Sequence, residues 1–575
     1  MKVFSELKKN LKKDFSVLVP LRVAILGDTP TQFIAQALRG HGYEEGFDLQ
    51  LWEAGFDQIE RQFLDMSSDL YEYNPEVVII FHSTHKLLEK YNRLKPEKAH
   101  TLADSRIDLV SNLVSAAKEK LRSKIIYYNY PEINDSIFGN YANKVVSSFL
   151  FQQRKLNLML MEFASKNFDF FVIDLASIQN QRGKRFMFQP SVYINTEIVL
   201  SIDVLPEVAK KTINVINSLQ GKSIKCIILD LDNTIWGGII GDDGLENIQI
   251  GGLGIGKAFT EFQYWAKKLK NRGIILAVCS KNTESIAKEP FEKHPEMILR
   301  LDDIAVFISN WENKVDNIKQ IQKILNISFD SMVFLDDNPF ERNMVREHIK
   351  TITVPELPED PAEYLEYLYA SDLFETVSHS STDETRTRQY QIEAQRTVIQ
   401  KYFTNEDDFL KSLNMHSVVE PFNKFNSPRV AQLSQRSNQF NLRTVRYTES
   451  EIISLSNKKN YHTFTFSLED KFGDNGLICV IILKNEDNDS LFIDSWFMSC
   501  RVLKRGMEHF VLNIISNYAK ENHFVFLIGE YLPTPKNDLV KYHYKNLGFK
   551  NTSKKWTLNL TTYQSKKSFI NTKNL

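Results

Sequence analysis

The sequence predicts an α/β protein with three domains. Two stretches, from about residue 21 to 174 and from about residue 224 to 347, alternate short β-rich runs with helical periodicity. This alternation is typical of parallel sheets covered by helices. The remainder is mixed, with helices first and strands afterwards, which favours an α+β domain. The length of 575 residues suits three or four domains of ordinary size. We expect domains at residues 1–215, 216–375 and 376–575.

The composition is that of a folded protein. Hydrophobic residues make up 42% and charged residues 25% of the chain. With 71 Lys and Arg against 72 Asp and Glu, the net charge is −1, so the overall charge does not indicate a nucleic-acid partner. No apolar run approaches the roughly 18 residues of a membrane span, and no signal peptide is recognised. We expect a cytoplasmic protein without a membrane partner. Four cysteines without a CxxC pair argue against a disulfide framework or a structural zinc site.

The N-terminal domain is expected to hold a Rossmann-like parallel sheet. Its β-rich runs predict strands at Arg22–Leu26, Glu76–Phe81, Lys124–Tyr128 and Phe170–Ile173. Helical spacing predicts helices at Asp104–Leu121, Asn143–Ala164 and Pro206–Leu219.

The central domain is expected to hold a second parallel sheet. Its predicted strands are Ile224–Leu229, Ile274–Val278, Ala305–Ile308 and Met332–Leu335. Its predicted helices are Gly256–Asn271, Asn313–Leu325 and Pro339–Glu347. Three of these strands end in polar clusters, and open parallel sheets bind ligands beyond the carboxyl ends of their strands. The short interval between the first two strands leaves little room for a large cap.

An Asp-x-Asp-x-Thr loop follows the first central strand directly. The buried strand would hold Asp230 at the sheet edge, where a carboxylate can attack phosphorus and form an aspartyl-phosphate. Asp232, two residues later, can protonate the leaving oxygen and then activate water. Because two carboxylates beside a phosphate repel one another, we expect a hard cation, and Mg²⁺ fits.

Later strand ends offer the other parts of such a site. Ser280 supplies a hydroxyl for a phosphate oxygen, and Lys314 supplies a cation at a helix start. Asp336 and Asp337 form a carboxylate pair that can hold the metal. The order Asp230, Ser280, Lys314, Asp336 resembles the four motifs of the haloacid dehalogenase superfamily.

Longer motifs closely resemble the FkbH-like (HAD-IIIC) family. They are Asp230–Gly238, Val278–Asn282, Asn310–Lys314, Asp336–Arg342 and Pro355–Pro358. The resemblance implies an enzyme that removes phosphate from a phosphorylated three-carbon substrate. It also implies delivery of the acyl unit to the phosphopantetheine thiol of an acyl or peptidyl carrier protein.

The resemblance also implies roles for individual residues. Asp230 would be the nucleophile and Asp232 the acid and base, with phosphate ligands at Thr234, Ser280, Lys281 and Lys314. Magnesium ligands would come from Asp230, Asp232, Asp336 and Asp337. Cys279 adjoins Ser280 and is a candidate for a transient thioester. The alternative is that Cys279 is a small core residue at the end of a buried strand.

The C-terminal part resembles an acetyltransferase-like (GNAT) domain. Predicted strands at Tyr461–Ser467, Leu477–Leu483 and Leu491–Phe497 precede a helix at Leu503–Lys520 and a strand at Phe524–Ile528. Arg501, Arg505 and Gly506 lie where such proteins receive a pyrophosphate on backbone amides, and Tyr544 would be the general acid. Because Leu503 and Glu508 depart from the acetyltransferase pattern, we favour docking of a pantetheine arm or carrier, or a structural role, over acetyl transfer.

The N-terminal domain faintly resembles SGNH-type hydrolases through Gly27-Asp28-Thr29. Those enzymes need a serine at the third position and a late Asp-x-x-His pair, whereas this chain has Thr29, and Ser177 three residues after Asp174. We therefore expect a binding or capping role for a degenerate domain.

Three functions fit the sequence. The leading hypothesis is a Mg²⁺-dependent enzyme that dephosphorylates a phosphoglyceryl substrate and loads the acyl unit onto a carrier thiol. A phosphatase acting on a small phosphorylated metabolite or sugar is the first alternative. A non-catalytic scaffold that binds a carrier is the second.

Overall fold

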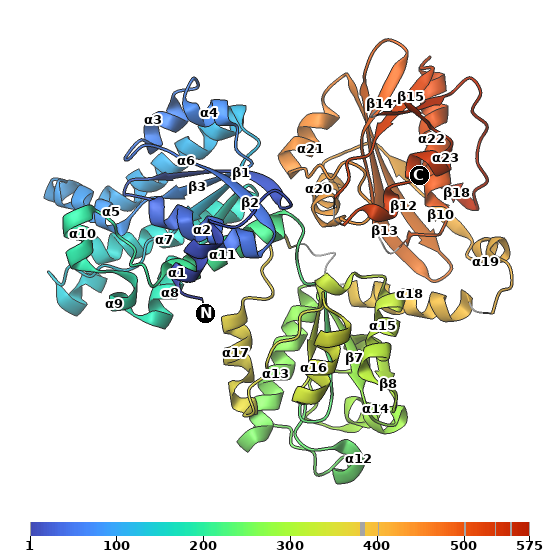
Figure 1. Ribbon diagram of the computed structural model, residues 1–575, viewed down its shortest axis with the longest axis horizontal. Coiled ribbons are helices and arrows are strands. Elements are labelled where there is room, and N and C mark those ends of the chain that lie inside the picture. The colour runs from blue at the N-terminus through green and yellow to red at the C-terminus, as the bar shows by residue number, and fades with distance from the viewer. Residues whose placement is uncertain are drawn as a thin grey trace. The chain divides into compact units, whose positions relative to one another are not determined.

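The computed structural model describes residues 2–379, 386–400, 402–499, 502–534, 536–552 and 555–573 (Figure 1). The chain divides into two compact units, Met1–Asn217 and Ser218–Leu575. The first unit contains one sheet, and the second contains two separate sheets within its described residues. The predicted multidomain α/β class is therefore confirmed. The predicted boundary near residue 375 stays a prediction.

The first unit is built on a parallel sheet with the order β2-β1-β3-β4-β5. Its strands are β1 (Val19–Gly27), β2 (Phe47–Glu53), β3 (Val77–Phe81), β4 (Lys124–Tyr128) and β5 (Phe170–Ile173). Every residue of β3 is buried, as expected for the central strand of a sheet covered on both faces. Strand β2 lies at the edge and was not predicted from the sequence.

Helices and short 3₁₀ turns connect and cover these strands. The α-helices are α1 (Phe4–Asn10), α2 (Gln32–Glu44), α3 (Ile59–Leu64), α4 (Asp69–Tyr73), α5 (Thr84–Asn92), α6 (Leu102–Lys120), α7 (Phe149–Lys166), α8 (Leu175–Arg182), α9 (Lys184–Met187), α10 (Pro190–Thr196) and α11 (Leu205–Leu219). Helix α7 begins six residues later than predicted, because the Ser148 hydroxyl caps it by accepting a hydrogen bond from the amide of Phe151.

The central sheet is parallel, with the order β8-β7-β6-β9. Its strands are β6 (Cys226–Leu229), β7 (Ile275–Ser280), β8 (Ile304–Ser309) and β9 (Met332–Leu335). Ile227 and Leu229 point into one hydrophobic core, whereas Cys226 and Ile228 point into another. This alternation places a core on each face of the sheet.

Helices follow each central strand. They are α12 (Ile240–Asp243), α13 (Gly254–Asn271), α14 (Glu284–Lys293), α15 (Lys314–Leu325), α16 (Pro339–His348) and α17 (Tyr364–Ser371). Between β6 and β7 the chain forms the four-residue α12 and then α13, so the predicted absence of a large cap is confirmed. Helix α14 was not predicted from the sequence.

The C-terminal sheet has nine strands within the described ranges, in the order β16-β17-β15-β14-β13-β12-β10-β18, with β11 paired to β12. They are β10 (Met415–Ser417), β11 (Val419–Glu420), β12 (Tyr461–Asp470), β13 (Gly473–Asn485), β14 (Ser490–Met498), β15 (Phe526–Glu530), β16 (Lys550–Thr552), β17 (Lys555–Asn559) and β18 (Ile570–Thr572). Neighbouring strands are antiparallel except β14–β15 and β10–β18, which are parallel. The sheet is thus mixed, as the α+β prediction requires.

Helices border this sheet on both faces. They are α18 (Arg386–Gln400), α19 (Glu406–Ser412), α20 (Ser427–Arg436), α21 (Glu449–Ser456), α22 (Met507–Glu521) and α23 (His543–Leu547). Ile481 of β13 packs in the same core as Val511 of α22, whereas Val480 packs in the core that contains Val430 of α20. Helix α22 begins at Met507, later than predicted, because Gly506 at its start has a φ of 73°.

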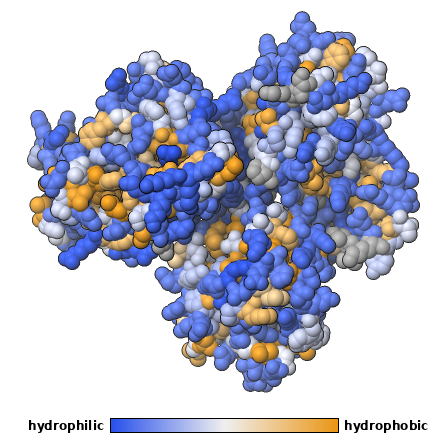
Figure 2. All heavy atoms as spheres, in the orientation of Figure 1, coloured by the Kyte–Doolittle hydropathy of each residue, from blue (hydrophilic) through white to orange (hydrophobic). Residues whose placement is uncertain are grey.

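The visible surface is mostly hydrophilic, with hydrophobic residues in scattered groups (Figure 2). Among the helices that the structure describes, none is long and apolar enough to cross a membrane. Cys226, Cys279 and Cys479 are buried free thiols, and Cys500 lies outside the described residues.

Candidate active site

The carboxyl ends of β6, β7 and β9 meet at one edge of the central sheet. Asp230 follows β6, Ser280 is the last residue of β7, and Asp336 follows β9. The register pairs Leu229 with both Val278 and Leu335, so these three strands end at nearly the same level. The Asp230 amide donates a hydrogen bond to the Leu335 carbonyl at 2.9 Å, which holds the two aspartates side by side.

Lys314 lies between two of these carboxylates. Its Nζ is 2.8 Å from Oδ1 of Asp230 and 2.6 Å from Oδ2 of Asp336. Lys314 is the first residue of α15, where the Asn313 side chain caps the helix by accepting from the amide of Asp316. Burial alone would lower the pKa of Lys314, but the charges of the two aspartates outweigh it and raise this pKa.

Three carboxylates at this edge can hold a cation. Asp230, Asp336 and Asp337 each offer an oxygen, and these oxygens all lie within 4.8 Å of one another. Burial, with the charge of Asp230 as a second cause, raises the pKa of Asp336 to about 7 and that of Asp337 to about 6. Lys314 supplies one formal positive charge beside these three carboxyl groups. A cluster in which carboxylates outnumber the neighbouring cation suits a hard divalent cation such as Mg²⁺.

Asp232 lies beside this cluster with its carboxylate turned to other partners. The Trp236 indole N–H donates to Oδ1 at 2.9 Å, as does the amide of Ile240 at 3.0 Å. The Asn282 side-chain amide donates to Oδ2 at 3.3 Å. Burial, and then the charge of Asp230, raise the pKa of Asp232. A carboxyl oriented in this way and with a raised pKa suits proton transfer.

The residues expected to bind phosphate lie in different environments. Ser280 is buried at the strand end. The Thr234 hydroxyl accepts from the Asp337 amide at 3.2 Å, so it links the loops after β6 and β9. Lys281 forms an ion pair with Glu341 at 2.6 Å, and its side chain remains 37% exposed.

Cys279 is enclosed by protein. Its thiol is fully buried and donates toward the Lys314 carbonyl at 3.8 Å. Burial raises its pKa, which disfavours the nucleophilic thiolate. This environment is that of a core residue.

The predicted C-terminal residues do not share one environment. Arg505 is buried in ion pairs with Asp470, at 3.2 Å, and with Glu393. Arg505 and Gly506 line a cavity of about 820 Å³, and Tyr544 is not among the residues that line it. The Tyr544 ring is buried against Gly529, where an added Cβ would lie 2.3 Å from the ring. Arg501 lies outside the described residues.

The N-terminal Asp28 and Asp174 occupy structural positions. The Ser83 amide donates to Asp28 Oδ1 at 2.8 Å, and burial raises the pKa of Asp28 to about 7. Asp174 caps α8 by accepting from the Ser177 amide at 2.9 Å. Asp174 is therefore a helix cap, and Ser177 stands where an SGNH-type hydrolase needs the histidine of its Asp-x-x-His pair.

Some site residues were present in the quoted motifs without a predicted role. Trp236 and Asn282 orient Asp232, as described above. Arg342 Nη1 donates to the Asp336 and Asp337 carbonyls at 2.8 and 2.6 Å, and so holds the loop that carries these two aspartates. Their motif positions were visible in the sequence, but their partners are brought together only by folding.

The parallel sheet, its edge of aspartates and the lysine at a helix start define a domain of the haloacid dehalogenase class. A family model described as FkbH, N-terminal domain, matches residues 22–217. A crystal structure of the N-terminal part of protein BF1531 from Bacteroides fragilis, containing a phosphatase domain complexed with Mg, is 59% identical with a TM-score of 0.63. That match covers 66% of this chain and 100% of that chain. The chain belongs to the FkbH-like family.

Two acetyltransferase structures also match about a quarter of the chain. One is the ribosomal-protein-S18-alanine N-acetyltransferase from Escherichia coli, with 13% identity, coverage of 26% of this chain and 96% of that chain, and a TM-score of 0.21. The other is the spermidine N-acetyltransferase from Vibrio cholerae in complex with CoA and spermine, with 12% identity, coverage of 25% and 96%, and a TM-score of 0.20. A search of curated proteins finds no match.

Proposed function

We propose that this chain is a magnesium-dependent phosphatase that acts on a small phosphate ester through Asp230. The observation that carries the proposal is the cluster of Asp230, Asp336 and Asp337, with Lys314 between two of them. The Mg-complexed phosphatase domain of the 59%-identical relative supports it.

The three clustered aspartates would hold the magnesium ion, and the raised pKa values of Asp336 and Asp337 fit that role. When bound, the ion would offset the negative charge of the carboxylates and of the phosphate oxygens. Lys314 contributes a fixed positive charge at the same place.

The chain's own residues supply the nucleophile and the proton. The Asp230 carboxylate attacks phosphorus, the P–O bond to the leaving group breaks, and Asp232 gives its proton to the departing oxygen. Asp232, now ionised, then takes a proton from water as the water oxygen attacks phosphorus, and the P–O bond to Asp230 breaks to free its carboxylate and release inorganic phosphate. Hydrogen bonds from Trp236, Ile240 and Asn282 keep the Asp232 carboxyl in one orientation.

Rapid-quench peptide mass spectrometry tests this chemistry. With p-nitrophenyl phosphate and Mg²⁺, we expect Asp232→Asn to accumulate a phosphoryl group on Asp230, because hydrolysis of the intermediate loses its base. Asp230→Asn serves as the matched control and should carry none. A phosphoryl group on another residue, or none in Asp232→Asn while wild-type protein turns over, would contradict the assignment.

We further propose a phosphoglyceryl substrate and transfer of its acyl unit to the phosphopantetheine thiol of a carrier protein. Membership of the FkbH-like family supports this finer function. The buried Cys279 thiol gives no support to a covalent role, so we propose direct transfer: the carrier thiol attacks the acyl carbon of the substrate's acyl phosphate, the C–O bond to phosphate breaks, and phosphate leaves. Intact-mass measurement of a carrier after incubation with bisphosphoglycerate should reveal acylation by both wild type and Cys279→Ala. Phosphate release without carrier acylation would be consistent with the phosphatase activity and would contradict the proposed acyl transfer.

A further inference from the structure

The loop that carries Asp232 is bonded to a tyrosine from a distant part of the chain. Tyr364 is the first residue of α17, and its hydroxyl donates to the Asn233 carbonyl at 3.2 Å. The two residues are 131 positions apart in the sequence. The motifs that form the carboxylate site do not include Tyr364.

The backbone turns sharply at Asn233, the residue directly after Asp232. Its φ is 54°, in the left-handed region, which asparagine adopts more readily than most residues other than glycine. The Asn233 side-chain oxygen accepts from the Gly238 amide at 2.9 Å. Asn233 therefore turns the chain after Asp232 and closes a loop from residue 233 to residue 238.

Closure of this loop places the donors that orient Asp232. The indole N–H of Trp236, which lies inside the loop, donates to Oδ1 of Asp232. The amide of Ile240, two residues after Gly238, donates to the same oxygen. If the loop loosens, both donors can move away from Oδ1, and the Asp232 carboxyl is free to rotate.

The hydrophobic core fixes the position of the Tyr364 hydroxyl. The residue is 2% exposed, and its ring packs edge-on against Phe259 and Phe262 of α13, with ring centroids 6.5 and 6.3 Å apart. Helix α13 also bonds to the loop, since the Gln263 side-chain amide donates to the Ile235 carbonyl at 2.7 Å. A hydrogen bond from a hydroxyl held in this way limits the movement of the loop.

We propose, on the basis of the proposed proton donation by Asp232, that Tyr364 is a positioning residue for this step. Its hydroxyl bonds to the backbone carbonyl of Asn233, so it acts through the loop and not on the reacting atoms. With the loop held, the Asp232 carboxyl gives its proton to the leaving oxygen as the P–O bond breaks. Without the bond, the carboxyl adopts other orientations, and esters whose leaving group needs the proton react more slowly.

Two phosphate esters that differ in their leaving group test the proposal on the full chain with Mg²⁺. p-Nitrophenolate leaves readily as an anion, whereas phenolate is a poorer leaving group and gains more from protonation. In Tyr364→Phe, we expect kcat/KM for phenyl phosphate to fall about tenfold, the factor that corresponds to one net hydrogen bond. For p-nitrophenyl phosphate, kcat/KM should stay within about twofold of wild type.

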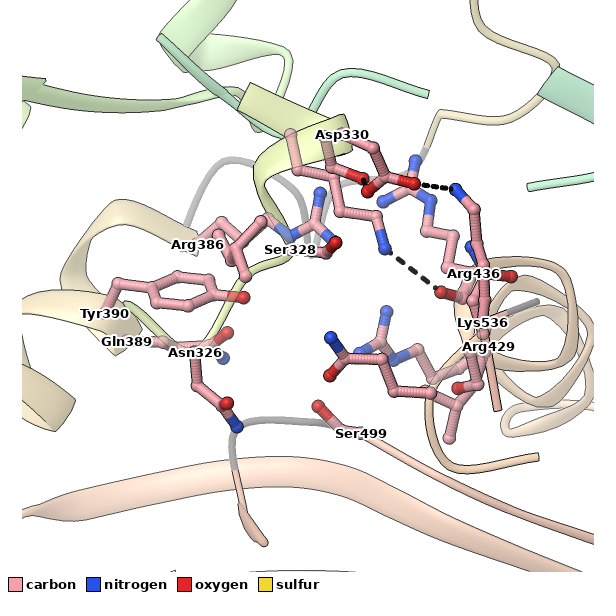
Figure 3. A pocket seen from close by; sticks show the side chains of 17 residues that line it. Asn326, Ser328, Asp330, Arg386, Gln389, Tyr390, Arg429, Arg436, Ser499 and Lys536 are labelled. Carbon is pink, nitrogen blue, oxygen red and sulfur yellow. Dashed lines mark hydrogen bonds and ion pairs between the residues drawn. The ribbon is translucent and has the colours of Figure 1, made fainter. Parts of the chain in front are cut away.

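Two controls measure general loosening of the domain. Tyr367→Phe is matched, because it removes a hydroxyl from the same helix that accepts from the Glu356 amide at 3.0 Å. Lys536→Gln breaks an ion pair of 2.7 Å with Asp330 on the wall of another cavity (Figure 3). Asp330 lies in the 3₁₀ turn that precedes β9, at the opposite end of this strand from the carboxylates. Each control should change kcat/KM for the two esters by the same factor.

Variants of Asn233 test the loop itself. Asn233→Ala loses the bond to Gly238 and disfavours the left-handed backbone, whereas Asn233→Gly loses the bond but keeps the backbone conformation accessible. Both should hydrolyse phenyl phosphate less well relative to p-nitrophenyl phosphate, and Asn233→Ala should show the larger change. The proposal is overturned if Tyr364→Phe slows both esters by the same factor, or if Asn233→Ala keeps the wild-type ratio.

Asp232→Asn distinguishes this proposal from the proposed function. We expect it to lower kcat/KM for phenyl phosphate much more than for p-nitrophenyl phosphate, because the proton donor is lost. An equal fall for both esters would contradict the role of Asp232 itself. The expected fall in Asp232→Asn, together with a wild-type ratio in Tyr364→Phe, would contradict the role of Tyr364 alone.

Discussion

Replacing Lys314 with glutamine tests the electrostatics of the carboxylate site. The lysine makes charge-assisted contacts of 2.8 and 2.6 Å to two aspartates, and both it and its partners are buried. Each such contact is worth about 1.5–3 kcal/mol, and removing one partner from a buried ionic group costs about 3–5 kcal/mol. Without Mg²⁺ at pH 8, we expect Lys314→Gln to lower the free energy of unfolding by about 3–5 kcal/mol.

Urea unfolding followed by tryptophan fluorescence measures this cost. Lys281→Gln is the matched control: its ion pair with Glu341 is as short, at 2.6 Å, but the lysine is 37% exposed, so a loss below about 1 kcal/mol is expected. At pH 5 the Lys314→Gln cost should shrink, because Asp336 and Asp337, whose pKa values are about 7 and 6, are then protonated. A loss at pH 8 no larger than that of the control, or an equal loss at pH 5 and pH 8, would refute the reasoning.

Three further predictions concern other parts of the molecule. Burial raises the pKa of Asp28 to about 7, above its usual 3.8, so the native state binds the extra proton between these values. Stability should therefore fall by about 3 kcal/mol as pH rises from 4 to 7, and urea unfolding of Asp28→Asn should lack this component. Mg²⁺ at 100 times its dissociation constant should stabilise the wild type by about 2.7 kcal/mol in thermal unfolding; Asp336→Asn should lose this gain, whereas exposed Asp316→Asn should keep it. Cys279→Ala should release phosphate within about twofold of wild type and cost about 1 kcal/mol of stability in urea; loss of activity without loss of stability would restore a chemical role for the thiol.

Hydrophobic patterning predicted most strands because buried parallel strands are short continuous apolar runs. The edge strand β2 was not predicted because its sequence mixes polar and apolar residues, and only Phe47 and Leu49 of this strand are fully buried. Two helices begin later in the sequence than predicted. The Ser148 cap sets the start of α7, and the positive φ of Gly506 sets the start of α22. Periodicity does not carry this information.

The motif order predicted which aspartates and which lysine would meet, because parallel strands end at one sheet edge. The partners of Asp232 and the carbonyls held by Arg342 depend on loop geometry that spacing does not encode.

Phosphate release by the purified full chain tests the central claim most directly. With Mg²⁺ and a small phosphate ester, wild type and Asp28→Asn should release inorganic phosphate, since Asp28 lies in the other compact unit. Asp230→Asn should release none, and EDTA should abolish release by the wild type. Release by Asp230→Asn at the wild-type rate would contradict the account.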